Sequence, residues 1–179
     1  MRYESIADIY SANEKIREIF LDAVGSITPE EAAALPEGEK WSIQQIVEHV
    51  SMVDTGALRI CAKLVEGAKA IGKPSDGKIN ITDEFSNKSG AVANVKVEAP
   101  ERVHPTGTVT IPEALERMKL NRPGFKSIQA DLERYDLSEP TFPHPFFGDI
   151  GAAEWLIIAG GHEMRHKQQI ERVLEKVRQ

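Results

Sequence analysis

The sequence predicts an all-α protein, a four-helix bundle with a long loop between its second and third helices. Four segments carry apolar residues at helical spacing, three helix starts show a capping box, and residues 72–109 are rich in glycine and proline with little periodicity. The 179 residues fit a single domain, residues 1–179, which is long enough to bury a hydrophobic core.

The first helix is predicted over residues 5–24, where the apolar residues share one face. They are Ile6, Ile9, Tyr10, Ile16, Ile19, Phe20 and Ala23. A short extra turn should follow, because Thr28 and Glu31 form a capping box with Pro29 at the first helical position.

The second helix has the clearest predicted start. Ser42 and Gln45 form a capping box, and Trp41 and Ile46 hold the positions of a hydrophobic staple. Apolar residues then repeat every seven positions, at Ile43, Val50, Ala57 and Leu64 and again at Ile46, Val53 and Ile60. His49 falls beside this apolar seam and not on the solvent side.

The long loop over residues 72–109 is predicted to hold at most a short extended stretch at residues 95–97. Thr110 and Glu113 then form a capping box that opens the third helix. Pro123 and Gly124 should kink or split this helix, because proline cannot donate its backbone hydrogen bond.

The fourth helix is predicted to begin after Asp149, which can act as its cap. Its inner face carries Ala152, Trp155, Ala159, Ile170, Val173 and Val177. His162 and His166 lie on the same face. Four helices with one long crossover are therefore expected.

Composition and charge exclude several classes of function. The net charge of −6, with basic and acidic residues interspersed, argues against a nucleic-acid surface. No apolar run is long enough to span a bilayer, so no membrane partner is expected. The first residues lack a signal-peptide pattern, and the single Cys61 suits a reducing compartment, so the protein is predicted to be cytoplasmic.

Two histidines of the fourth helix point to a metal site. His162 and His166 are four residues apart, which places both imidazoles on one helix face, close enough to chelate one ion. His49 is the natural third ligand, because it flanks the inner seam of another helix. Three neutral nitrogens would suit Zn²⁺ or Ni²⁺ and leave a coordination position open, as in catalytic sites. The alternative is that each histidine is a hydrogen-bonded core residue.

Residues 162–166 also match H-E-x-x-H, the zinc motif of a class of metalloproteases. Those enzymes take a third ligand from downstream, and the thirteen residues after His166 contain neither histidine nor aspartate, which disfavours a protease. Glu163 is a weak candidate for a catalytic carboxylate, since it is rotated about 100° from His162, and a solvated charge is its simpler interpretation. His144, in the loop before the fourth helix, is a weak candidate for an acid, a base or a substrate contact, with a structural role as the alternative.

Three further residues have two interpretations each. Gly160 and Gly161 precede His162 inside a helix, either to leave room for a ligand over the metal or to allow close helix packing. Gln169 can form a hydrogen bond near the metal or lie on a solvated face. His104 is not assigned to the site, because the long loop around it cannot be placed from the sequence.

Residues 41–49, the His-Pro-Phe-Phe-Gly stretch at 144–148, and Trp155 with residues 162–170 resemble the DinB-like superfamily. The resemblance covers essentially the whole chain. It implies a four-helix bundle, commonly a homodimer, with a divalent metal held by one histidine of the second helix and two of the last. At matching positions these ligands are His49, His162 and His166.

The resemblance also implies candidate activities. Characterised relatives include bacillithiol-dependent S-transferases and a mycothiol-dependent isomerase, and other members are described as metal-dependent hydrolases without an established activity. We therefore expect a metal-dependent transferase or hydrolase in which the metal activates a thiol or water, with a small-molecule substrate and a low-molecular-weight thiol as partner. This hypothesis predicts a pocket with an open coordination position. The alternative is a noncatalytic metal-binding or stress-response bundle with no cavity above the site.

Overall fold

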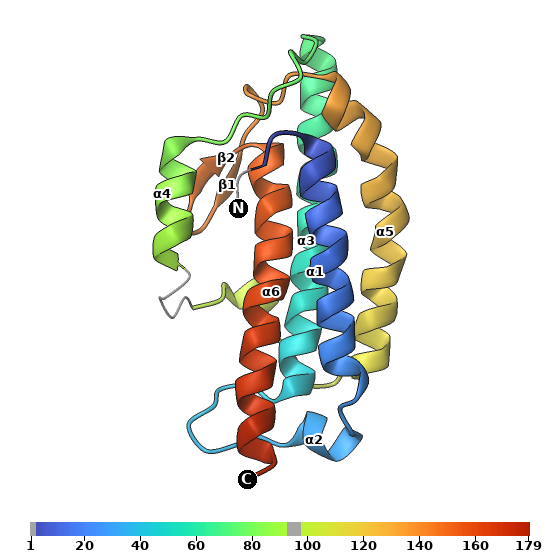
Figure 1. The fold of residues 1–179 in the computed structure, drawn as a ribbon, viewed down its shortest axis with the longest axis vertical. Helices are drawn as coiled ribbons and strands as arrows, with labels where there is room; N and C mark the ends of the chain where they lie inside the picture. The colour runs from blue at the N-terminus through green and yellow to red at the C-terminus, as the bar shows by residue number, and fades with distance from the viewer. Residues whose placement is uncertain (1–2, 93–97) are drawn as a thin grey trace.

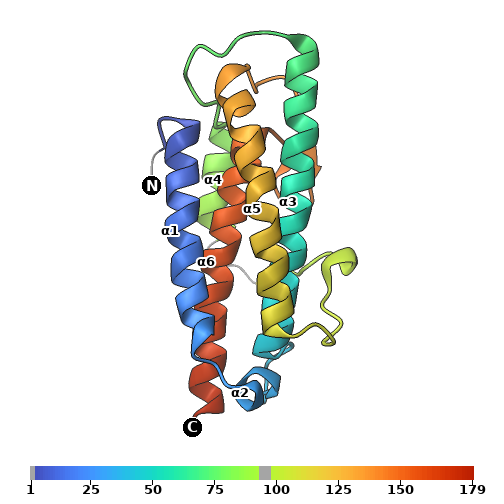
Figure 2. The same cartoon turned by 90° about the vertical axis from the view of Figure 1, so that its right-hand side faces the viewer.

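The computed structural model describes residues 3–92 and 98–179 and confirms the four-helix bundle. Four long helices, α1, α3, α5 and α6, lie side by side along the long axis of the molecule (Figures 1 and 2). In chain order the elements are α1 (Ile6–Gly25), α2 (Pro29–Ala33), α3 (Ile43–Ile71), α4 (Asp83–Val92), η1 (Glu101–Val103), α5 (Ile111–Arg134), β1 (Phe142–His144), β2 (Gly148–Ile150) and α6 (Ala152–Val177).

The long crossover joins two helices that run in the same direction. Figure 1 shows α3 and α5 both rising from the end of the bundle that carries α2, while α1 and α6 descend toward it. The chain must therefore return along the whole bundle between α3 and α5, as the expected long connection requires. Helix α3 packs against both α5 and α6, and α1 packs mainly against α6.

The predicted helix starts are confirmed by reciprocal hydrogen bonds. The Ser42 hydroxyl accepts from the Gln45 backbone N–H at 3.3 Å, and Gln45 Oε1 accepts from the Ser42 N–H at 3.0 Å. The same pattern joins Thr28 to Glu31 and Thr110 to Glu113. These caps satisfy backbone donors that have no partner within the helix.

The crossover contains more regular structure than the sequence predicted. Helix α4 and the short helix η1 form within the segment expected to be a loop. Helix α4 lies outside the four-helix core in Figure 1, and the yellow-green segment that contains η1 projects to one side of the core in Figure 2. Phe85 of α4 is 3% exposed and packs against Phe147 with ring centroids 5.0 Å apart. A helix held by so few apolar contacts leaves little periodicity in the sequence, which is why the prediction missed it. The predicted extended stretch at residues 95–97 lies outside the described residues.

The start of α6 also differs from the prediction. Asp149 does not cap the helix, because it belongs to β2, which pairs antiparallel with β1 in a small hairpin. Gly151 is the cap residue instead, and Glu154 Oε2 accepts a hydrogen bond from its N–H at 2.9 Å. The hairpin takes up the residues before α6, and the cap therefore lies two positions downstream of Asp149, at Gly151.

Helix α5 runs unbroken through Pro123 and Gly124, so the predicted split does not occur. Gly124 lies directly against α3: a Cβ built there would come within 2.7 Å of Leu58 Cδ2. The glycine therefore serves the close approach of two helices, and packing against α3 holds the helix together across the proline.

The core consists of two apolar clusters with polar residues between them. One cluster includes Ile6, Ile9, Cys61, Leu64, Trp155 and Leu156, and the other includes Phe20, Val24, Ile43, Ile46, Ile170 and Val173. Along α3 and α6 the intervening buried residues include Asp54, Glu163 and His166. Within the described part of the chain, no helix combines the length and the apolar character needed to cross a bilayer.

Candidate metal centre

The structure brings His49, His162 and His166 together across α3 and α6. The Nε2 atom of His162 lies 3.1 Å from Nε2 of His49 and 3.1 Å from Nε2 of His166. All three ligand atoms fall within 4.8 Å of one another. Nitrogen ligands about 2.1 Å from one ion would lie roughly 3.0 to 3.4 Å apart at octahedral or tetrahedral angles. The spacing therefore fits one shared cation.

Hydrogen bonds at the far side of two rings fix where their lone pairs point. His49 Nδ1 lies 2.7 Å from the Val103 carbonyl oxygen, and His166 Nδ1 lies 2.8 Å from Gln169 Oε1. Both partners are acceptors, so each Nδ1 carries the proton and each neutral ring has its lone pair on Nε2. A proton on His162 Nε2 can point at only one of these two nitrogens. In at least one of the two Nε2 pairs, therefore, two lone pairs face each other with no hydrogen between them. A metal ion bound by these nitrogens would remove this repulsion.

The three imidazoles are held in the neutral form that a metal requires. Burial lowers the pKa of His166 to about 3 and lowers that of His162 well below its ordinary value, with the neighbouring imidazoles adding to both effects. Burial also lowers the pKa of His49, although the Val103 carbonyl opposes this shift. Neutral rings near pH 7 need not lose a proton before they bind a cation.

Segments from different parts of the chain orient the site. Val103 ends η1, so the crossover supplies the carbonyl that holds His49. Gln169 lies on α6 one turn after His166, and the expected hydrogen bond near the site is present. Such outer contacts set the tautomer and direction of a ligating histidine.

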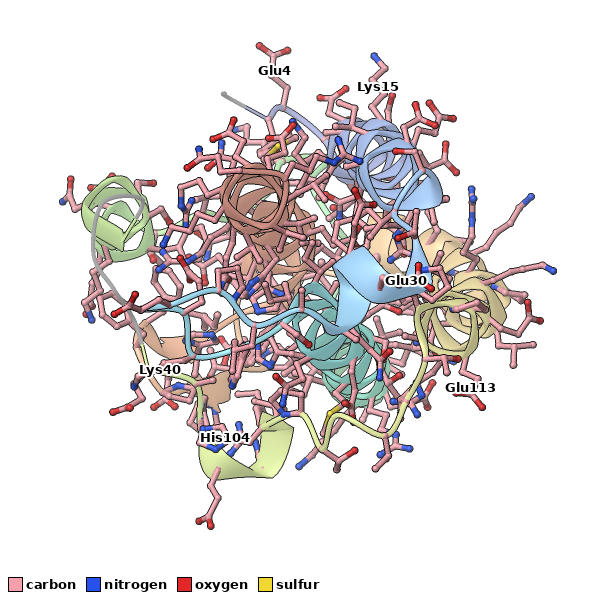
Figure 3. All side chains as sticks on the ribbon, turned by 90° about the horizontal axis from the view of Figure 1, so that it is seen from below. Glu4, Lys15, Glu30, Lys40, His104 and Glu113 are labelled. Carbon is pink, nitrogen blue, oxygen red and sulfur yellow. The ribbon has the colours of Figure 1, made fainter. Side chains whose placement is uncertain are left out.

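Trp41 and His104 cover the His49 side of the cluster. The Trp41 ring lies 4.9 Å from the His49 ring and 6.2 Å from the His104 ring, between centroids. His104 Nε2 is bonded to the Ala99 carbonyl oxygen at 2.8 Å and does not join the three histidines. In the view along the bundle (Figure 3), His104 lies beside η1 at the edge of the molecule.

Glu163 is neither exposed nor directed at the histidine cluster. It is 5% exposed, and both of its carboxylate oxygens accept hydrogen bonds from the Arg17 guanidinium, at 2.6 and 2.8 Å. The same guanidinium donates to Asp54 Oδ1 at 2.7 Å. The interpretation of Glu163 as a solvated charge is therefore wrong. Its oxygens are occupied by Arg17, which further disfavours the water-activating role of the H-E-x-x-H proteases.

This ion-pair network joins all four long helices and was not predicted from the sequence. Arg17 comes from α1, Asp54 from α3 and Glu163 from α6, and Asn121 of α5 donates to Asp54 Oδ2 at 2.6 Å. One signal was available: Asp54 lies four residues after the buried Val50, at an inner position of the α3 seam. Nothing in the sequence shows that Arg17, 146 residues before Glu163, reaches the same layer.

His144 is a neutral, partly exposed histidine of β1. Its Nδ1 accepts hydrogen bonds from the backbone N–H groups of Phe146 and Phe147 at 3.1 and 3.2 Å, so Nε2 carries the proton. The ring packs 5.1 Å from the Trp155 ring. Burial, helped by the charge of Arg102, lowers the pKa of His144 to about 4. These contacts give the ring a structural role. A substrate contact through its Nε2–H stays a prediction.

Two cavities of the structure lie on another side of the bundle. One of about 420 Å³ opens between α1, α5 and α6 and is lined by Arg17, Asp54 and Glu163 among others. A second of about 350 Å³ lies between α1 and α5. None of the three histidines lines either cavity. The open pocket expected above the cluster is therefore not one of these two.

The two glycines before His162 have different surroundings. A Cβ built on Gly160 would lie 2.1 Å from Asn13 Oδ1, whereas one built on Gly161 would meet nothing within 4 Å. Gly160 therefore allows close packing of α6 on α1, the second of its two expected roles. Asn13 uses this space to donate a hydrogen bond from Nδ2 to the Leu156 carbonyl oxygen at 2.9 Å.

Comparisons with known proteins agree with this fold. The family model of the DinB superfamily matches residues 12–170. Uncharacterized protein YuaE of Bacillus subtilis (strain 168) is 24% identical over 143 residues, which cover 79% of this chain and 82% of that protein. The crystal structure of TT2238, described as a four-helix bundle protein, matches with a TM-score of 0.62 and 20% identity over 94% of this chain and 99% of that one. The structural match supports the fold alone. Because the family model spans most of the sequence, the chain belongs to the DinB superfamily.

Proposed function

We propose that the protein is a metal-dependent enzyme, a thiol-dependent S-transferase or a hydrolase, whose divalent ion is held by His49, His162 and His166. The observation that supports the ligand set is the meeting of three neutral Nε2 atoms, two of them fixed as lone-pair donors by hydrogen bonds to Nδ1. Zn²⁺ and Ni²⁺ suit such a nitrogen site best. A bound ion would lower the pKa of a thiol or water molecule and so supply a nucleophile at neutral pH.

Charge around the histidines favours an anionic substrate group. Among the described residues, the cluster contains only imidazoles and no carboxylate, so a divalent ion there would keep its full charge. The charge of Arg165 is among the causes that lower the pKa of His162, so a cationic side chain lies near the cluster, whereas His144 is neutral near pH 7. A thiolate or a hydroxide would offset this charge, whereas a cationic ligand would be repelled. The substrate is therefore proposed to be a small molecule, with a low-molecular-weight thiol as co-substrate.

The first experiment measures metal content and metal affinity. Protein purified without a histidine tag or chelator should contain about one zinc or nickel per chain, and His49→Ala and His162→Ala should each remove it. His104→Ala is the matched control, because this histidine lies beside Trp41 but outside the cluster and should leave metal binding unchanged. Wild-type protein that is metal-free and cannot be loaded with zinc or nickel would contradict the proposal.

The second experiment separates an enzyme from a noncatalytic bundle. The noncatalytic alternative is a metal-binding or stress-response module, and neither of the two cavities described above is lined by a histidine of the cluster. Metal-loaded protein should be assayed for thiol consumption with electrophilic substrates and for ester or amide hydrolysis. Turnover that is lost in His162→Ala and unchanged in His104→Ala would support the enzyme. Metal binding without turnover in either screen would favour the module.

A further inference from the structure

The buried carboxylate of Glu48 lies next to the site but does not face the three histidines. Its side chain is on α3, directly before His49, and is 2% exposed. Oε1 accepts hydrogen bonds from Thr106 N and Thr106 Oγ1 at 3.0 and 2.7 Å, and Oε2 accepts from Gly107 N at 2.8 Å. All three donors belong to the crossover, just after η1. Burying a carboxylate is costly unless such charge-assisted hydrogen bonds satisfy it.

The segment that Glu48 holds is the one that orients His49. Residues 103–107 begin with the Val103 carbonyl, which accepts the His49 Nδ1–H at 2.7 Å, and end at the docked Gly107. Gly107 has a φ of +79°, and a Cβ there would lie 3.3 Å from Gln45 Nε2, so this end of the segment sits close against α3. Gln44 Nε2 also donates to the Gly107 carbonyl at 2.9 Å.

We infer that Glu48 is a positioning residue for the metal centre: by docking residues 103–107 on α3, it places the Val103 carbonyl where it fixes the tautomer and direction of His49. The inference deepens the proposed function, because the ligand it orients belongs to the proposed metal site. Glu48 accepts three hydrogen bonds from this segment, whereas Gln44 donates one to it. A change at Glu48 should therefore act on the metal through His49 and not by direct contact.

The chain contains a matched control for this residue. Glu154 of α6 is also 2% exposed, and its Oε1 accepts from Thr82 N and Thr82 Oγ1 at 2.8 and 2.7 Å. Its Oε2 accepts from Gly151 N at 2.9 Å. Glu154 thus repeats the hydrogen bonds of Glu48, but the segment it docks leads into α4 and carries no contact to a histidine of the cluster.

The test compares Glu48→Gln with Glu154→Gln. In each variant an amide nitrogen replaces one acceptor and meets a backbone N–H, so both should lose similar stability. In metal-free protein, ring ¹⁵N chemical shifts should show His49 in the Nδ1–H form for the wild type and Glu154→Gln, and as a mixture of tautomers for Glu48→Gln. Zinc affinity should fall about tenfold in Glu48→Gln and stay within about twofold in Glu154→Gln, as expected for an outer-sphere contact.

The outcomes separate this inference from the proposed function. A wild type that binds no metal rejects the proposed function, whereas the tautomer measurement needs no metal and tests Glu48 alone. An unchanged His49 tautomer in Glu48→Gln, with zinc affinity equal to that of Glu154→Gln, overturns the inference. If Glu48→Gln does not fold, Thr106→Val removes one donor at smaller cost. It should still shift the tautomer, and an unchanged ring would reject the role of the docked segment.

Discussion

Replacing Gly160 with alanine should destabilise the protein, while the same change at the adjacent Gly161 should stabilise it. Alanine in place of glycine inside a helix gains about 1 kcal/mol in the free energy of unfolding when nothing opposes the methyl group. Gly161 meets this condition, because a Cβ there has no neighbour within 4 Å. At Gly160 the same Cβ would lie 2.1 Å from Asn13 Oδ1 and 2.9 Å from Asn13 Cγ, so the asparagine must move.

The size of the loss follows from what Asn13 does. Moving its side chain breaks the 2.9 Å hydrogen bond to the Leu156 carbonyl oxygen, worth about 1 kcal/mol, and forces a shift in tightly packed surroundings that costs about 1 to 3 kcal/mol. After the helix gain is subtracted, Gly160→Ala should lower the free energy of unfolding by about 1 to 3 kcal/mol. In an Asn13→Ala background the nearest remaining atom is Ile16 Cδ1 at 3.3 Å, so Gly160→Ala should become neutral or stabilising.

Urea unfolding followed by circular dichroism measures the single and double variants at one pH. The expected signature is a change of sign: Gly160→Ala destabilises the wild type but not Asn13→Ala, and Gly161→Ala stabilises both. Zinc affinity should stay unchanged in Gly160→Ala, because packing and not ligand space explains this glycine. Equal stabilisation by the two glycine substitutions in the wild type would refute the packing argument.

Three further outcomes are expected. Burial lowers the pKa of His144 from 6.5 to about 4, so between these pH values the unfolded chain binds a proton that the folded chain does not. The free energy of unfolding should therefore fall by about 1 to 2 kcal/mol as the pH decreases from 6.5 to about 4. His144→Gln should remove that part of the pH dependence, and parallel urea-unfolding profiles for the two proteins would contradict it. Arg17→Met should lower the free energy of unfolding by about 3 kcal/mol, since it leaves Asp54 and Glu163 buried without their cation; a loss below about 1 kcal/mol would disprove a stabilising network. The Cys61 thiol, whose pKa burial raises to about 12, should resist a thiol-specific reagent in the folded protein and react in urea, and rapid labelling of the native state would show that it opens.

The four long helices and the three histidines could be predicted because the information for them is local. A capping box such as Ser42 with Gln45 spans three residues, and the apolar repeat of α3 is visible within one helix. The spacing of His162 and His166 places them on one face whatever the helix packs against. The prediction that His49 joins them required one further step. The helices that carry these histidines, α3 and α6, each present an inner face, and a four-helix bundle brings such faces together.

The remaining features depend on contacts between distant segments. Helix α4 relies on Phe85 packing against the hairpin, and the start of α6 depends on that hairpin forming before it. Helical periodicity showed that Glu163 points in a different direction from His162. It could not show that Glu163 faces the Arg17 guanidinium, which comes from another helix. The carbonyl that orients His49 has no side-chain signal at all, because any residue at position 103 supplies the same oxygen.

By itself, then, the sequence determined the four long helices, their inner faces and the histidines that those faces carry, because each depends on a helical period and on nearest neighbours. The tertiary structure decided how the polar groups around the histidines are satisfied: Glu163 by Arg17, Glu48 by the crossover, and His49 by a backbone carbonyl. A buried polar group takes whichever partner packing brings within hydrogen-bonding distance, and that partner can lie anywhere along the chain.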